Sequence, residues 1–318
     1  MEKRKLGNSG LTVMPWAFGG NVFGWTADEK TSFQLLDAFV DAGFDLIDTA
    51  DVYANWVPGN KGGESETIIG KWLKQKGNRE KVIIATKVGG AMQPSGKKDL
   101  SAKYIRQAVE DSLQRLQTDY IDLYQSHWDD LDTPVGETIE IFAQLIREGK
   151  VRAIGASNLS AERLQESIQY SKEKNLPSYQ TLQPEYNLYN REKYETLYEP
   201  ICLREGLGVL NYYALASGFL SGKYRTEEDV NKSARGGGVV KTYLNERGLR
   251  ILKALDEVAA QYNTTPASIA LAWLVARPSI TAPIASATSV EQVKELAKAF
   301  QLQLDKEAIE KLDKASAY

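Results

Sequence analysis

The sequence predicts an α/β fold, a closed (β/α)8 barrel with an N-terminal β-hairpin and a C-terminal helical extension. Short β-branched or apolar segments alternate with amphipathic helical segments along the chain, which is typical of a parallel sheet. Eight such strands can be counted in 318 residues, a length that suits this type of barrel. No low-complexity tract or linker divides the chain, so we expect a single barrel domain over residues 1–318.

The predicted strands are short and lie at fairly regular intervals. They are Met14–Phe18, Leu46–Thr49, Val82–Lys87, Ile121–His127, Val151–Ala156, Thr181–Pro184, Val209–Tyr212 and Thr281–Ala285. Ahead of the first strand, Lys3–Leu6 and Leu11–Val13 flank the turn sequence Asn8-Ser9-Gly10. This pattern predicts a hairpin that plugs one end of the barrel.

The segments between the strands have the spacing of amphipathic helices. Val135, Ile139 and Phe142 fall on one helical face, for example. Ser160 and Thr265 are residue types that cap helix N-termini, and the second of them precedes a proline. The tail after residue 305 predicts a further helix. The long segment 214–244 contains three consecutive glycines and predicts a functional or mobile loop.

A doubly wound open sheet is the alternative that we weighed. Its dinucleotide-binding form needs G-x-G-x-x-G between the first strand and the first helix. The nearest run, residues 19–24, has the wrong spacing, and no G-x-x-x-x-G-K-[ST] run is present. We therefore prefer the barrel.

Composition excludes several classes of function. With 39 basic and 42 acidic residues the net charge is −3, so we expect no nucleic-acid partner and no anionic membrane partner. The longest apolar run, Ala267–Ala276, is too short to span a bilayer, and the chain start lacks an apolar signal core, so we expect a cytoplasmic location. Cys202 and His127 are the only residues of their types, which argues against an internal disulfide and against a metal site built from several such ligands.

Polar and aromatic residues end the predicted strands two to seven. Barrels of this kind have their active sites at this rim. The residues are Asp48 with the nearby Tyr53, Lys87, His127, Ser157 with Asn158, Gln183 and Tyr212. Each has a plainer reading when taken alone, as part of an ion pair, a packed ring or a helix cap. Their joint occurrence at consecutive strand ends favours an active site.

This group of side chains suits protonation of an oxygen that gains negative charge. A lysine in an apolar strand needs a paired charge, and Asp48 is the natural partner of Lys87. A free tyrosine has a pKa of about 10, and a cation at ~4 Å in an effective dielectric of ~20 contributes about 4 kcal/mol. We therefore predict that Lys87 lowers the pKa of Tyr53 toward neutrality. No nucleophile–base pair is evident, which argues against acyl transfer.

Several long motifs occur in one order along the chain. They are Phe44–Tyr53, Gly63–Glu66, Ala85–Lys87, Asp119–Trp128, Lys150–Asn158, Gln183–Asn187 and Gly218–Tyr224. With these motifs the chain resembles the aldo-keto reductases over essentially its whole length, and its spacing is similar to the bacterial branch that also contains potassium-channel β-subunits. The resemblance implies a TIM barrel and NAD(P)H-dependent reduction of small aldehydes or ketones to alcohols.

The resemblance also implies roles for residues at matching positions. Asp48, Tyr53, Lys87 and His127 match the family's catalytic tetrad, with Tyr53 as the general acid. The residues expected to bind the cofactor are Gly20, Asp48, Ser157, Asn158, Gln183, Tyr212, Leu215, Ser217, Gly218, Lys223, Arg235, Ser286, Thr288 and Gln292. Trp25, Trp56 and Trp128 would line the substrate pocket, and no metal is expected.

The chain departs from the family pattern at two places. Ser286-Ala287-Thr288 stands where Gly-Ala-Arg or a similar run is usual, and Leu296 replaces a usual Asn. NADPH is the cofactor that the resemblance implies, while NADH or dual use stays open because these positions would contact its adenosine end. Near strand seven, Tyr213-Ala214 replaces a common Ser-Pro.

Two other functions stay open from the sequence. One is a nicotinamide-binding regulatory or partner-docking subunit with little turnover, as the channel β-subunits suggest. The other is a phosphate-sugar isomerase on the same barrel, since barrels host many reactions. The physiological substrate, the direction of the reaction and the oligomeric state are left open.

Overall fold

The computed structural model describes residues 2–92, 96–233 and 236–318. Eight parallel strands form its sheet in the order β10-β3-β4-β5-β6-β7-β8-β9. Their bounds are β3 (Ala17–Gly19), β4 (Leu46–Asp48), β5 (Ile83–Val88), β6 (Ile121–Ser126), β7 (Val151–Ser157), β8 (Thr181–Gln183), β9 (Gly208–Val209) and β10 (Ile284–Ala285). Backbone hydrogen bonds from Thr281 to Val209 and from Ile284 to Asn211 join the two ends of this order into a ring. The predicted fold class is confirmed.

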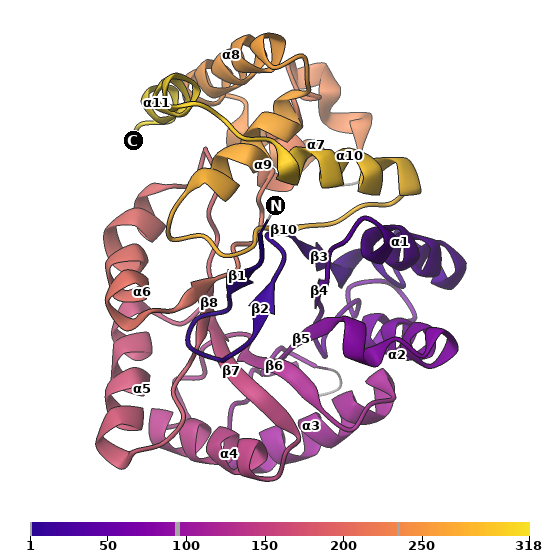
Figure 1. Cartoon of the computed structure of the whole chain (residues 1–318), viewed down its shortest axis with the longest axis vertical. Coiled ribbons are helices and arrows are strands. Elements are labelled where there is room, and N and C mark those ends of the chain that lie inside the picture. Colours follow the sequence, from indigo (N-terminus) through magenta and orange to yellow (C-terminus); the bar gives the residue numbers. More distant parts are fainter. Residues whose placement is uncertain (1, 93–95, 234–235) are drawn as a thin grey trace.

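Helices surround the ring of strands (Figure 1). They are α1 (Glu29–Asp41), α2 (Glu64–Lys76), α3 (Ala102–Leu116), α4 (Val135–Arg147), α5 (Ala161–Lys174), α6 (Glu199–Glu205), α9 (Pro266–Ala276) and α10 (Val290–Gln301). Three more, α7 (Gly236–Tyr243), α8 (Glu246–Gln261) and α11 (Lys306–Ala315), lie outside the ring at the top of Figure 1. Ser160 and Thr265 cap α5 and α9 as predicted, with their side chains accepting from Arg163 N and Ser268 N.

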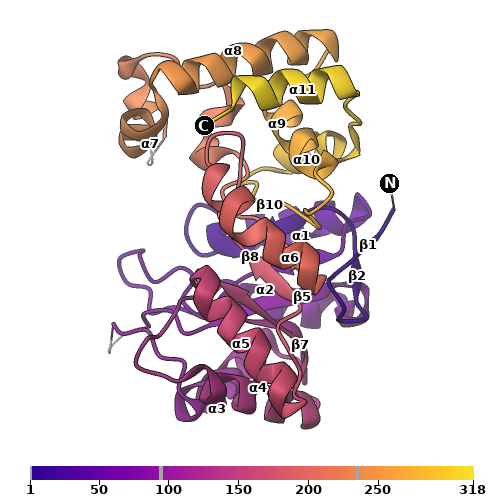
Figure 2. The same cartoon turned by 90° about the vertical axis from the view of Figure 1, so that its left-hand side faces the viewer.

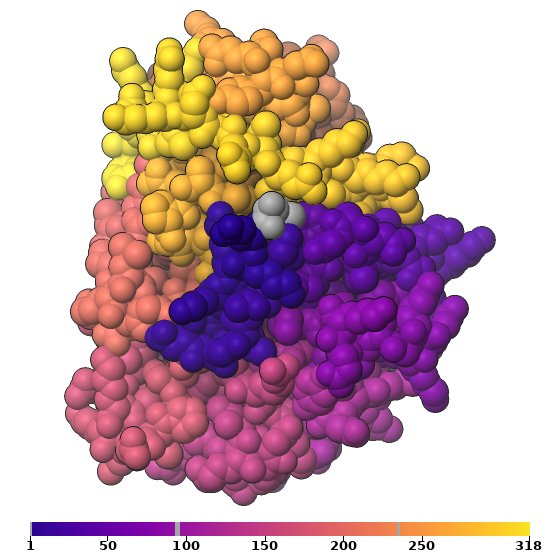
Figure 3. Space-filling view, in the orientation of Figure 1, coloured from indigo at the N-terminus to yellow at the C-terminus, as the bar shows by residue number. Residues whose placement is uncertain are grey.

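The N-terminal hairpin closes one end of the barrel. Its strands β1 (Arg4–Lys5) and β2 (Thr12–Val13) pair antiparallel. The hairpin side chains of Leu6, Leu11 and Val13 are buried in an inner cluster with strand residues such as Leu46 and Leu123. Figure 3 shows this segment lying across the middle of one face, and Figure 2 shows it on the opposite side of the molecule from α7. The loops that follow the strands therefore lie at the other end of the barrel, which the hairpin does not cover.

Three of the predicted strands extend three residues too far at an end that lies beside a proline. The first and last predicted strands begin at Met14 and Thr281, whereas β3 and β10 begin after Pro15 and Pro283. Proline has no N–H to donate to a ladder. The predicted seventh strand reaches Tyr212, but β9 ends at Val209. Opposite its extension lies Pro184, which accepts from Tyr212 N at 2.9 Å and has nothing to donate in return. None of the described helices has both the length and the apolar character that crossing a bilayer requires.

Candidate active site

A buried ion pair lies where β4, β5 and β8 end. Lys87 Nζ lies 2.7 Å from Asp48 Oδ2, and Gln183 Nε2 donates to Asp48 Oδ1 at 2.8 Å. Lys87 is fully buried and Asp48 is 2% exposed. Burying both charges requires this mutual pairing together with the further hydrogen bonds. The structure thus brings together three of the predicted residues from three strands.

Tyr53 lies in the loop between β4 and α2, within reach of the same ammonium group. Lys87 Nζ donates to Tyr53 Oη at 3.4 Å and to the Thr49 carbonyl at 2.8 Å. The side chain of Thr49 is fixed by two further hydrogen bonds. Its Oγ1 donates to Ser65 Oγ, and Ser65 Oγ donates to Gly20 O. We did not predict parts for Thr49 and Ser65, although both lie in the motifs quoted above.

The predicted acidification of Tyr53 is wrong. Burial raises the pKa of the Tyr53 phenol above its ordinary value; Lys87 lowers this pKa, but Asp48 raises it again. The main physical reason is burial, which disfavours the charged phenolate. Lys87 opposes this effect, but Asp48 lies closer to the ammonium group than the phenol does and partly cancels its field. Burial disfavours the charged form of Lys87 as well, but Asp48 and Tyr53 more than offset this and leave the pKa of Lys87 raised.

His127 follows β6 and faces the phenol. The ring centroids of His127 and Tyr53 are 5.8 Å apart at an interplanar angle of 75°. The side chain is 7% exposed, and its Nδ1 has no hydrogen-bond partner among the described residues. Burial, followed by the positive charge of Lys87, lowers the pKa of His127 well below its usual value. The imidazole is therefore neutral near pH 7.

Asn158 links the residues that follow β6, β7 and β9. Its Nδ2 donates to the His127 carbonyl at 2.9 Å, and its Oδ1 accepts from Tyr212 Oη at 2.9 Å. Its φ of +53° lies in the left-handed region, which asparagine tolerates better than most residues. Ser157 Oγ donates to the Gln183 carbonyl at 2.8 Å. Four predicted cofactor residues are thus joined in one network beside the ion pair.

The three predicted pocket tryptophans form aromatic contacts with the same group. Trp56 lies 5.6 Å from Tyr53 and 5.7 Å from Trp25 between ring centroids. Trp128 stacks on His127 at 5.9 Å. Trp56 and Trp128 remain 44% and 39% exposed, so their rings stand at the open rim.

The loop after β9 has a backbone that suits an anion. Leu215 precedes the 3-10 segment η4 (Ala216–Ser221), in which Ser217 and Gly218 have φ values of 56° and 92°. Successive N–H groups around left-handed residues form concave anion sites. A Cβ added to Gly218 would lie 3.3 Å from Lys223 Nζ, so an ammonium group flanks this backbone. Arg235, the other predicted cation, lies outside the described residues.

The remaining predicted cofactor residues lie around β3 and the start of α10. Gly20 has no room for a side chain, because a Cβ would lie 2.9 Å from Ser65 Oγ and 3.0 Å from Asp48 O. Ser286 Oγ is 2.7 Å from both Gly19 O and Asn21 Oδ1. Thr288 N donates to Gln292 Oε1 at 2.8 Å. No hydrogen bond within the described ranges joins Thr288 or Gln292 to the Asp48–Lys87 pair.

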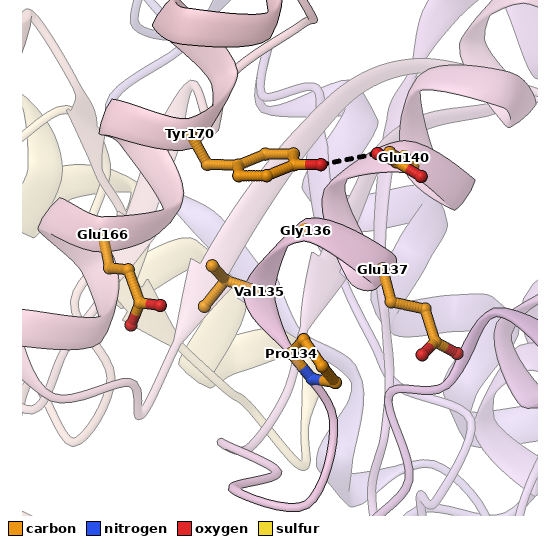
Figure 4. A pocket seen from close by; sticks show the side chains of 7 residues that line it. All are labelled: Pro134, Val135, Gly136, Glu137, Glu140, Glu166 and Tyr170. Carbon is orange, nitrogen blue, oxygen red and sulfur yellow. Dashed lines mark hydrogen bonds between the residues drawn. The ribbon is translucent and has the colours of Figure 1, made fainter.

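A separate hollow lies on the outer helical layer between α4 and α5 (Figure 4). Its acidic side chains are occupied in holding helices together, since Tyr170 donates to Glu140 and Ala102 N donates to Glu137. Its third acid, Glu166, lies 3.7 Å from Arg163. Nothing in this hollow resembles the converging groups at the strand ends, which remain the candidate active site.

Comparison with known proteins agrees with this architecture. The sequence of the "Uncharacterized oxidoreductase YrpG" of Bacillus subtilis is 36% identical over 320 residues, covering 98% of this chain and 95% of that protein. The "NADH-specific methylglyoxal reductase" of Escherichia coli is 33% identical over 329 residues, covering 96% and 95%. The "Probable voltage-gated potassium channel subunit beta" of rice (Oryza sativa subsp. japonica) is 33% identical over 324 residues, covering 98% and 96%. The sequence model of the aldo/keto reductase family matches residues 15–317, and the chain belongs to that family.

Proposed function

We propose that this chain reduces small aldehydes or ketones to alcohols with a nicotinamide cofactor, and that Tyr53 gives its proton to the product oxygen. The observation behind this proposal is the convergence of Lys87, Tyr53 and His127 at one rim of the barrel. The relative named as a methylglyoxal reductase supports a carbonyl substrate. The tryptophans beside Tyr53 and His127 offer an apolar wall for it.

The residues at the rim fit a nicotinamide dinucleotide. The polar side chains of Ser157, Asn158 and Gln183 suit a carboxamide, and Tyr212 offers an aromatic ring for stacking. The left-handed backbone at Gly218 with Lys223 beside it suits a pyrophosphate. When bound, a reduced nicotinamide supplies the hydride that goes to the carbonyl carbon.

The protein side chains then manage the oxygen. Because burial keeps the phenol of Tyr53 protonated near neutral pH, its proton is available at the moment when the substrate oxygen becomes an alkoxide. Lys87 donates to Tyr53 Oη and would stabilise the phenolate that is left behind. Neutral His127 can donate a ring N–H to the same substrate oxygen, which fixes the orientation of the carbonyl. Strong prior acidification of the phenol is not needed, since an alkoxide is the stronger base.

We propose NADPH as the cofactor, with NADH also accepted. The proposal of NADPH follows from the family resemblance. The use of NADH is supported by Thr288, an uncharged residue bonded to Gln292 at a position where an arginine is frequent. The relative that is named NADH-specific supports it too.

The variant Tyr53→Phe tests the proposal. Loss of the general acid should lower kcat on short aldehydes by roughly 100-fold to 10,000-fold. The Kd for NADPH, measured by the quenching of tryptophan fluorescence, should stay unchanged. Tyr213→Phe, which removes a hydroxyl from a half-exposed tyrosine of the same rim, is the control and should keep normal turnover. Near-normal rates for Tyr53→Phe would contradict the proposed proton transfer.

A second candidate function is a nicotinamide-binding subunit that docks on a partner protein. The relative named as a potassium-channel β-subunit favours it. Steady-state rates with a panel of aldehydes separate the two functions. Rapid multiple turnover supports the reductase, whereas tight NADPH binding with less than one turnover per minute supports the docking subunit.

A further inference from the structure

Lys98 lies at the substrate side of the rim. Its Nζ is 4.8 Å from the centroid of the Trp128 ring, an arrangement in which a cation is attracted by the face of an indole. The Trp128 ring in turn stacks on His127 at 5.9 Å. One exposed tryptophan ring therefore contacts both the ammonium group and the imidazole that would hold the carbonyl.

The loop that contains Lys98 is fastened to the loop that contains Trp128. Two residues beyond Lys98, Leu100 is buried and its N–H donates to Asp130 Oδ2 at 3.0 Å. The same oxygen of Asp130 accepts from Thr133 Oγ1 at 2.6 Å. These bonds connect the segment after β5 with the segment after β6. The ammonium group is consequently held near the pocket by backbone that is itself anchored.

Three acidic residues next to Lys98 and Trp128 in the sequence bond to other groups. Asp129 pairs with Arg163 at 3.1 Å, Asp130 makes the bonds just described, and Asp99 accepts from Ser101 N at 2.9 Å. No carboxylate within residues 2–92, 96–233 and 236–318 forms an ion pair with Lys98. Within those residues the ammonium group of Lys98 therefore has no carboxylate in direct contact, and it lies beside an apolar ring.

We propose that Lys98 is a specificity residue that binds a carboxylate on the substrate. The favoured substrates would be oxo acids whose carboxylate is separated from the reacting carbonyl by an aromatic ring or a few carbon atoms. That spacer would lie along Trp128, while the carbonyl reaches Tyr53 and His127. This inference rests on the proposed reductase function and names the substrate class for the same site.

The test compares two substrates of similar size that differ in charge. They are 4-carboxybenzaldehyde and methyl 4-formylbenzoate, each reduced with NADPH by the wild-type protein and by Lys98→Met. The variant should raise KM for the carboxylate about fivefold, the upper range for one exposed ion pair. KM for the ester and kcat for both should not change. Added salt should reduce the wild-type preference for the carboxylate, because salt screens exposed charges.

Two further variants show whether the effect belongs to this position. Lys98→Arg keeps the charge and should keep the preference for the carboxylate. Lys103→Met removes another exposed lysine, on α3, and should behave as the wild type. Equal effects of Lys98→Met on acid and ester, or no effect on either, would overturn the proposal while leaving the reductase function intact.

A binding measurement covers the case in which the protein does not turn over. Titration with 4-(hydroxymethyl)benzoate, followed by tryptophan fluorescence, should give a Kd about fivefold weaker for Lys98→Met than for the wild type. Equal Kd values would overturn the assignment of Lys98. Absence of turnover with a retained difference in Kd would instead reject the proposed function alone.

Discussion

At the scale of single residues, His127 offers a clean test of the electrostatics of the site. It is the only histidine in the chain, and burial keeps its pKa well below the usual value. In the unfolded chain the imidazole has a pKa of about 6.5. Between the lowered pKa and about 6.5, the unfolded state therefore binds a proton that the folded state does not.

We predict that this difference makes the protein less stable as the pH falls below about 6.5. The stabilisation from keeping His127 neutral is fully present above the unfolded pKa and is lost toward the folded pKa. The slope contributed by one such group is at most about 1.4 kcal/mol per pH unit. Denaturant unfolding at several pH values between 5 and 8 measures it.

The matched control is His127→Gln, which keeps a polar group of similar reach but does not titrate. Asp51 acts in the opposite direction, because burial and then Glu66 raise the pKa of its carboxyl well above the usual value, and its contribution falls as the pH rises. The wild type and His127→Gln both contain Asp51, so the difference between their free energies of unfolding at each pH reports on His127 alone. Parallel stability profiles for the two proteins would show that the imidazole is not held neutral.

At the scale of elements, the start of α10 is where we expect a substitution to alter the choice of cofactor. Thr288 and Gln292 bond to each other, and Ser289 caps the helix by accepting from Gln292 N. A guanidinium group pairs well with a phosphate dianion. We predict that Thr288→Arg raises the ratio of kcat/KM for NADPH to that for NADH about tenfold, which corresponds to about 1.4 kcal/mol.

Thr288→Val is the control, since it removes the hydroxyl without adding charge and should leave the ratio near that of the wild type. Initial rates at a fixed aldehyde concentration give both ratios. An unchanged ratio in Thr288→Arg would mean that the 2′-phosphate does not approach the start of this helix.

The strands could be predicted well because their pattern is local. The apolar runs around Ile47, Ile84, Tyr124 and Ile154 are buried, as expected for a sheet covered by helices. The largest errors fall at strand ends beside Pro15, Pro184 and Pro283, where the backbone lacks a donor, and other strand ends differ by at most a single residue. Met14 also lies outside the sheet, because its N–H donates to the side chain of Asp45 rather than to a neighbouring strand.

The residues of the site could be predicted from the sequence, but the directions of their pKa shifts could not. The sequence indicates that Asp48, Lys87 and Tyr53 meet, because each follows or ends a neighbouring strand. It does not indicate how deeply the phenol of Tyr53 is buried, which is the main cause of its raised pKa, or that Asp48 lies closer to the ammonium group than the phenol does. Lys98 was missed for a related reason: a lysine in an irregular loop has no periodicity that could place it over Trp128.

At the scale of the whole molecule, the two ends of the barrel have different tasks. One end is filled by the hairpin, whose apolar side chains continue the inner cluster of the strands. The other end holds the charged and aromatic groups of the candidate active site. We therefore expect the geometry of the second end to depend on packing at the first only through the strands that join them.

This division of tasks predicts that stability and activity can be separated by a substitution in the plug. Leu6 is fully buried in the inner cluster, so Leu6→Ala should lower the free energy of unfolding by about 2–5 kcal/mol, from lost burial and the cavity that remains. Leu131→Ala removes the same atoms from a side chain that is 79% exposed and should change stability by less than about 0.5 kcal/mol. Denaturant unfolding measures both variants. Because Leu6 lies at the far end of the strands from Tyr53, kcat/KM of Leu6→Ala should stay near that of the wild type under conditions where the protein is folded. A large loss of kcat/KM in folded Leu6→Ala would mean that the plug fixes the rim geometry as well as the core.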